Sequence, residues 1–175
     1  MPDENEPTQP SSQTKLTLEQ ALSLAIQHHS VGDLPKAGYI SEQILQAHPD
    51  QPVALHLLGV IAHHKGQYDS AVDLITRALA ITPEDAEANN DLGPPLRALG
   101  RLDEAVTSYQ KALAIKPDLA EAHYNLGNIF RQLGKPGEAV ASFKKALTFE
   151  PGNSKTHFNL GHVLRDTGKL DDAVA

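Results

Sequence analysis

The 175-residue chain contains no cysteine and no tryptophan, and it has only four tyrosines and four phenylalanines. Without cysteine it cannot form disulfides, thiolate metal sites or a cysteine nucleophile, and this composition is typical of a reducing compartment. We therefore predict a cytoplasmic location. The chain also lacks a run of about 18 apolar residues, the length of a membrane-spanning helix, so no membrane partner is expected.

A basic surface is missing as well. Lysine and arginine number 15 against 22 aspartates and glutamates, which gives a formal net charge of -7. Nucleic acids bind to positively charged surfaces, so they are not expected as partners. The motifs of catalysis are also absent, including a phosphate-binding glycine loop and a nucleophile paired with its base. The segment is thus predicted to be non-enzymatic, with no catalytic residue and no cofactor.

The first residues differ in character from the rest. Residues 1–16 begin MPDENEPTQPSSQ, a polar, acidic and proline-rich stretch. A secretory signal needs a basic start followed by an apolar run, and neither is present. We expect this stretch to be a disordered leader.

The rest of the chain repeats with a period of 34 residues. Two glycine columns, two alanine columns and one proline column keep this spacing: Gly59, Gly93, Gly127 and Gly161; Gly32, Gly66, Gly100, Gly134 and Gly168; Ala37, Ala71, Ala105, Ala139 and Ala173; Ala78, Ala112 and Ala146; Pro49, Pro83, Pro117 and Pro151. Each period reads as two amphipathic helices joined by a turn. One such unit cannot bury its own apolar face, so the units must stack.

Each column has a structural reason. The first glycine column lies inside the first helix of each unit, where a missing Cβ lets the second helix approach closely. The second glycine column lies between the helices and suits a left-handed turn. Capping boxes are predicted at Thr17 with Gln20 and at Asp118 with Glu121.

These columns resemble the tetratricopeptide repeat (TPR) family, and the resemblance covers Leu18 to Ala175. It implies an all-α fold, a right-handed solenoid of stacked antiparallel helix pairs with about four and a half repeats. The units are expected at residues 18–51, 52–85, 86–119, 120–153 and, incomplete, 154–175. The incomplete last unit leads us to expect either that the polypeptide continues past Ala175 or that its open end pairs with another copy.

The third unit departs from the pattern at Pro94 and Pro95, inside its first helix. Two prolines remove two backbone donors, and each proline in a helix interior costs about 3 kcal/mol or more. We predict a kink or break near Gly93, and we favour a kink held by neighbouring repeats over a functional hinge.

In the TPR family the first helices line a concave groove, and the resemblance places a set of polar and aromatic side chains there. A carboxamide can pair with both the C=O and the N–H of an extended peptide, and a guanidinium can grip a carboxylate. Candidate peptide-binding residues are therefore Asn90, Asp91, Arg97, Tyr124, Asn125, Asn128, Arg131, Phe158, Asn159, His162 and Arg165. The alternatives are a solvated polar surface and, for the arginines, ion pairs with Glu87, Glu121 or Asp166.

Two more specific resemblances concern the asparagines. Asn125 and Asn159 resemble groove asparagines in the repeat region of protein O-GlcNAc transferases. Asn128 with Asn159 resembles part of the carboxylate clamp of chaperone-binding TPR domains, but Tyr124 stands where its first lysine would be.

The nine histidines do not predict a metal site. His28 with His29 and His63 with His64 are adjacent in sequence, so their side chains diverge on a helix. No HExxH pattern is present, and no metal is expected.

The leading hypothesis is a protein–protein interaction scaffold that binds an extended peptide or partner protein in its concave groove. One alternative is the substrate-recognition arm of a larger O-GlcNAc transferase-like enzyme whose catalytic domain lies beyond residue 175. A second alternative is a scaffold that associates with itself.

Overall fold

The computed structural model describes residues 16–168, and this range contains nine α-helices and no strand. In chain order the helices are α1 (Leu18–Ser30), α2 (Leu34–Ala47), α3 (Pro52–His64), α4 (Tyr68–Ile81), α5 (Ala86–Ala98), α6 (Leu102–Ile115), α7 (Ala120–Gln132), α8 (Pro136–Phe149) and α9 (Ser154–Asp166). The predicted leader up to residue 15 and the predicted helix from Asp171 lie outside the described residues. None of the described helices is long and apolar enough to cross a membrane.

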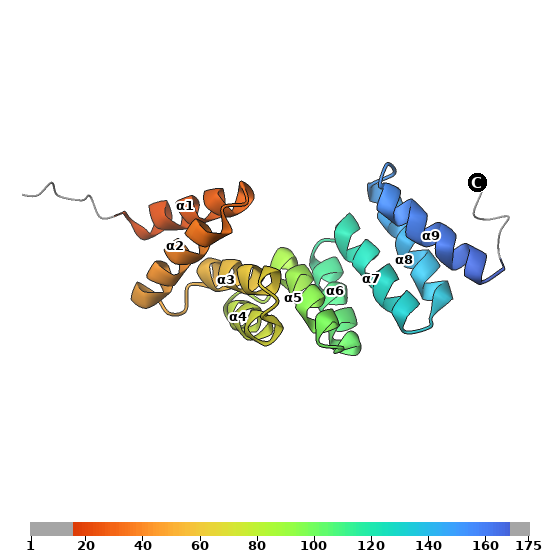
Figure 1. Ribbon diagram of the computed structural model, residues 1–175, viewed down its shortest axis with the longest axis horizontal. Helices are drawn as coiled ribbons and strands as arrows, with labels where there is room; N and C mark the ends of the chain where they lie inside the picture. The colour runs from red at the N-terminus through yellow and green to blue at the C-terminus, as the bar shows by residue number, and fades with distance from the viewer. Residues whose placement is uncertain (1–15, 169–175) are drawn as a thin grey trace, which may run out of the picture.

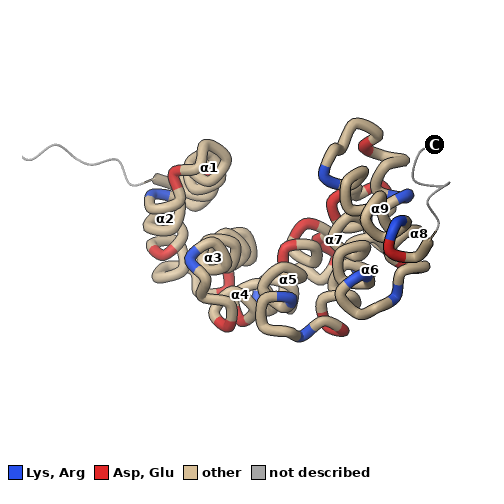
Figure 2. Tube along the Cα trace, turned by 45° about the vertical axis from the view of Figure 1, so that its right-hand side comes forward, with Lys and Arg blue, Asp and Glu red and all other residues tan. Residues whose placement is uncertain are grey.

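The helices form one curved row. Each odd-numbered helix packs against the helix that follows it, and each pair packs against the next pair (Figure 1). Odd-numbered helices also contact the next odd-numbered helix, whereas no such contact joins the described even-numbered helices. The odd-numbered helices therefore lie on the inner side of the arc, which Figure 2 shows as an open curve from α1 to α9. The predicted all-α solenoid is confirmed.

Close approach within each pair depends on the first glycine column. A Cβ added at Gly59 would lie 2.5 Å from Ile75 Cγ1, and one at Gly127 would lie 2.6 Å from the Phe143 ring. At Gly93 it would fall on the Tyr109 ring. These three partners are also 34 residues apart, and all are buried. The second glycine column has φ between +68° and +79°, as expected for left-handed turns.

The capping predictions have two outcomes. Thr17 and Gln20 form the predicted capping box, with the Gln20 N–H donating to Thr17 Oγ1 at 3.2 Å and the Thr17 N–H donating to Gln20 Oε1 at 2.9 Å. The box predicted at Asp118 is wrong. Helix α7 starts one residue later, so its N-cap is Leu119, which has no side chain able to accept a hydrogen bond.

The predicted break near Gly93 is also wrong, because α5 runs unbroken from Ala86 to Ala98 with both prolines inside it. Gly93 has no Cβ to meet the Pro94 ring, and this removes part of the usual clash. Pro95 is almost fully buried, so packing from the neighbouring helices holds it in place. Normal hydrogen bonding resumes at once, since the Leu99 N–H donates to the Pro95 carbonyl at 3.1 Å.

Candidate functional site

The predicted peptide-binding residues all lie on three consecutive odd-numbered helices. Helix α5 carries Asn90, Asp91 and Arg97, α7 carries Tyr124, Asn125, Asn128 and Arg131, and α9 carries Phe158, Asn159, His162 and Arg165. These helices border the concave side of the arc, so the set shares one surface (Figure 2). The individual side chains, however, have different partners.

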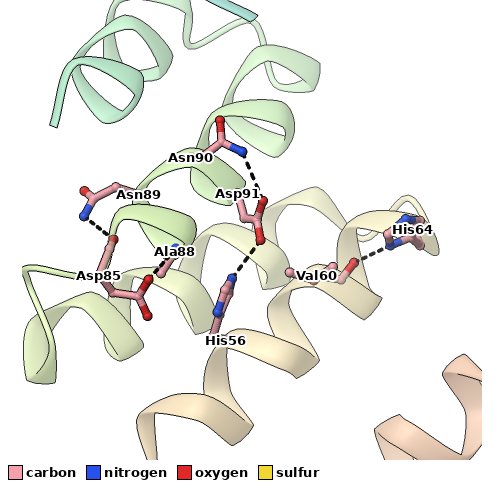
Figure 3. Close-up of polar contacts among 8 residues, drawn as sticks. All are labelled: His56, Val60, His64, Asp85, Ala88, Asn89, Asn90 and Asp91. Carbon is pink, nitrogen blue, oxygen red and sulfur yellow. Dashed lines mark hydrogen bonds and ion pairs between the residues drawn. The ribbon is translucent and has the colours of Figure 1, made fainter. Parts of the chain in front are cut away.

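One class of side chain links neighbouring repeats. His56 Nε2 on α3 lies 2.9 Å from Asp91 Oδ2 on α5 (Figure 3). Two repeats further on, Asn159 Nδ2 on α9 donates to the Tyr124 hydroxyl on α7 at 3.2 Å. Both pairs span 35 residues, so the same two positions of the repeat are joined by different chemistry. These side chains hold the floor of the groove together.

The asparagines are accordingly unequal. Asn159 Nδ2 also donates to Asn128 Oδ1 at 2.9 Å, and Asn128 Nδ2 donates to the Tyr124 carbonyl at 3.2 Å. Asn128 is 8% exposed, so it is largely withdrawn into this network. Asn125 is half-buried and makes no side-chain hydrogen bond with any other described residue. The structure thus distinguishes one available carboxamide from two that are already engaged.

Asn90 lies beside the His56–Asp91 link and is only 3% exposed. Its Nδ2 donates weakly to Asp91 Oδ1 at 3.4 Å, while its own Oδ1 is buried without a partner among the described residues. Figure 3 shows this oxygen pointing away from Asp91. Asn90 therefore belongs to the wall of the groove and offers little of its amide to a ligand.

The arginine column also divides. Arg165 donates from its guanidinium to His162 Nδ1 at 2.8 Å and lies 3.4 Å from Asp166 Oδ1, so it has partners within its own helix. Arg97 and Arg131 form no ion pair with any other described residue. Both line a pocket of about 620 Å³ together with Asn128, Gln132 and Asp166. The pocket draws side chains from α5, α7 and α9, and so from three consecutive repeats.

The two candidate aromatics differ in exposure. Phe158 is 67% exposed, and its only aromatic neighbour in the described chain is His162, whose ring lies edge-on at 4.4 Å. Tyr124 is half-buried, with its ring centroid 6.0 Å from that of Phe143. Phe158 therefore presents an apolar face to the groove, whereas Tyr124 is part of the packing.

Charge changes across the groove. Burial raises the pKa of Glu121 at the start of α7, and the nearby Asp91 and Glu150 carboxylates raise it further. Burial lowers the pKa of His63 near the end of α3, with smaller contributions from His64 and Arg97. The starts of α5 and α7 thus carry acidic groups, and the ends of the odd-numbered helices carry basic ones.

A recurring clasp between repeats escaped the sequence analysis. Asn89 Nδ2, His123 Nε2 and His157 Nε2 lie 3.1, 2.9 and 2.8 Å from the carbonyls of Pro83, Pro117 and Pro151 respectively. A carbonyl only accepts, so each histidine donates from Nε2. These positions are also 34 residues apart, and a comparison of polar side chains with the proline column would have found them. Among the described residues, no three histidines, aspartates or glutamates are grouped to hold a metal ion.

Models of the tetratricopeptide repeat match residues 29–90, 120–153 and 142–175, and a further TPR repeat model matches residues 96–134. No curated protein shows significant sequence similarity to this chain.

Solved structures are similar in fold. MamA is 22% identical and has a TM-score of 0.77, with 90% of this chain and 86% of that chain covered. A TPR protein of Thermus thermophilus is 24% identical, with a TM-score of 0.71 and coverage of 90% and 86%. The APC/C hetero-tetramer Cut9–Hcn1 is 22% identical, with a TM-score of 0.80 and coverage of 85% of this chain and 30% of that chain. From the repeat columns, the helix pairs and these matches together, the chain belongs to the tetratricopeptide repeat family.

Proposed function

We propose that this protein–protein interaction scaffold binds an extended segment of a partner protein along its concave surface. The observation that carries the proposal is the pocket between α5, α7 and α9, because a ligand that fills it contacts three repeats at once. An extended chain suits such a surface better than a compact ligand, since its recognition groups are spread along the row of helices.

The chemistry of the surface supports a peptide. Asn125 has a carboxamide with donors and an acceptor for a peptide backbone, and the exposed Phe158 ring can cover an apolar side chain of the ligand. Asn128 and Asn159 support the site indirectly, because they fix Tyr124 and the spacing of α7 and α9.

Two other hypotheses lack support from the comparisons. Neither a glycosyltransferase arm nor self-association is indicated by the matched families and structures. The TPR fold is typically non-catalytic, and we propose that this segment performs no chemistry of its own. The cytoplasmic location stays a prediction, which cell fractionation would test.

A peptide library displayed on phage and selected on the immobilised chain tests the groove. Selected peptides should bind the wild type and lose about tenfold or more affinity for a double variant, Asn125→Ala with Phe158→Ala, because it removes one hydrogen-bonding group and one apolar contact. A matched control is Lys144→Ala with Thr148→Ala, two exposed residues of the outer helix α8. Peptides that bind both variants as they bind the wild type would place the binding surface outside the groove.

A further inference from the structure

One edge of the groove is basic in every repeat. The last turn of each odd-numbered helix contains basic residues, and because these helices run parallel to one another, their ends line the same edge: His28 and His29, His63 and His64, Arg97, Arg131, and Arg165. The first two repeats supply histidine and the last three supply arginine. Permanent positive charge is therefore concentrated where α5, α7 and α9 end.

The opposite edge has the opposite sign in the middle of the array. The first turn of α5 contains Glu87 and the first turn of α7 contains Glu121. Asp91 lies one turn further into α5 and raises the pKa of Glu121, which shows that the two carboxyl groups feel each other. A negatively charged ligand is thus repelled from this edge and attracted to the other.

The pocket at the basic edge has an unusual balance of charge. Two guanidiniums, those of Arg97 and Arg131, face it without an ion-pair partner among residues 16–168, while Arg165 is held by His162 and Asp166. Asp166 also lines the pocket, so its formal charge is two positive groups against one negative group. The remaining single positive charge suits a monoanion better than a dianion.

We propose that the pocket between α5, α7 and α9 binds a carboxylate of an acidic peptide segment that lies along the arginine edge. This inference rests on the proposed function and names the class of partner. Two planar guanidiniums match the two oxygens of a carboxylate through forked hydrogen bonds. Gln132, and the N–H of Asn128 Nδ2 that is not donated to the Tyr124 carbonyl, supply amide donors for the peptide backbone beside it. Asp166 disfavours a doubly charged phosphate at the same place.

The test uses the full chain and a fluorescein-labelled peptide of alternating glutamate and serine, with binding followed by fluorescence anisotropy at low and at physiological salt. The double variant Arg97→Gln with Arg131→Gln should lose about tenfold or more affinity, since each charge-assisted hydrogen bond contributes substantially to binding. The control variant Lys144→Gln with Lys145→Gln removes the same two charges from the exposed surface of α8 and should bind like the wild type. Equal losses in both variants would show non-specific attraction and would overturn the proposal.

Three further peptides sharpen the result. A peptide with glutamine in place of glutamate should not bind measurably, and equal binding of this peptide would overturn the proposal. A phosphoserine peptide should bind no more tightly than the glutamate peptide, and tighter binding would assign the pocket to phosphate instead. An amidated peptide distinguishes the two sources of a carboxylate, because retained affinity assigns the side chain and lost affinity assigns the chain terminus.

The outcome is separable from that of the general groove. If library peptides depend on Asn125 and Phe158 but show no acidic preference, only the inference about the arginine pocket fails. If no library peptide depends on the groove, the proposed function fails as well.

Discussion

The third and fourth repeats share a backbone arrangement but carry different groove chemistry. Gly93 and Gly127 both receive an aromatic ring from the second helix, Tyr109 in one repeat and Phe143 in the other. At the next position, however, the third repeat has Pro94, which lacks an N–H, and the fourth has Asn128, which takes part in a hydrogen-bonded network. The small residues thus determine how the helices stack, while the adjacent groove position accepts very different side chains.

The position before the shared glycine pair teaches the same lesson. Asp91 is joined to His56 of the preceding repeat, and Asn159, two repeats later, is joined to Tyr124. Both links cross the same joint between odd-numbered helices, one with a carboxylate and one with an amide. The repeat therefore requires a polar bridge at this joint more than it requires a particular residue.

The largest predicted effect tests the shared glycines. Gly93→Ala and Gly127→Ala, made separately, should each lower the free energy of unfolding by about 3 kcal/mol, because the new Cβ overlaps a buried aromatic ring. Urea denaturation followed by circular dichroism would measure this loss. Gly161→Ala is the matched control, since no atom lies within 4 Å of its new Cβ, and it should gain up to about 1 kcal/mol from helix propensity. Similar losses at all three glycines would contradict the packing role.

A smaller effect of opposite sign is predicted at Pro94. Pro94→Ala restores a backbone donor to the interior of α5, and we expect a gain of about 1–2 kcal/mol after allowing for the greater entropy of the unfolded chain. The counterpart Asn128→Ala should instead lose about 1 kcal/mol, because it removes the hydrogen bonds to Asn159 and Tyr124. The same denaturation experiment measures both. A loss of stability in Pro94→Ala would mean that the proline ring itself is required for packing.

The smallest predicted effect compares the histidine edge with the arginine edge. Burial, His64 and Arg97 lower the pKa of His63 below its usual 6.5, although Asp91 opposes them. A lowered pKa means that the unfolded chain binds the proton more readily, so the contribution of His63 is present above pH 6.5 and is lost as the pH falls through its folded pKa.

Thermal unfolding at a pH of about 7.5 and about 5.5 measures this contribution. The midpoint should fall less on acidification in His63→Gln than in the wild type. His64→Gln serves as the exposed control at the neighbouring position. An identical fall in wild type and His63→Gln would remove His63 as a source of the pH dependence.

The fold was predictable because it follows from residues that repeat. Glycine columns with a fixed period report close helix approach and left-handed turns, and both are local requirements that sequence alone reveals. The break predicted at Gly93 failed because a propensity argument treats α5 alone, whereas α5 packs against α3, α4, α6 and α7. Tertiary packing outweighed the intrinsic cost of two prolines.

The candidate site was predictable as a surface but not as a set of free groups. The period correctly indicates which helices share a face, yet it does not show that Asn159 and Asn128 bind each other or that Arg165 binds His162. Such pairings depend on distances of a few ångströms between repeats. The peptide-binding role of the individual residues stays a prediction.

The contacts of each helix reach only its nearest neighbours along the row. Such a molecule behaves like a spring, because no long-range contact ties its two ends together. Small rotations at successive joints add up, so a change at one bridge, such as His56–Asp91, would swing every repeat beyond it. A partner that bound across several joints would stiffen the spring and fix its curvature.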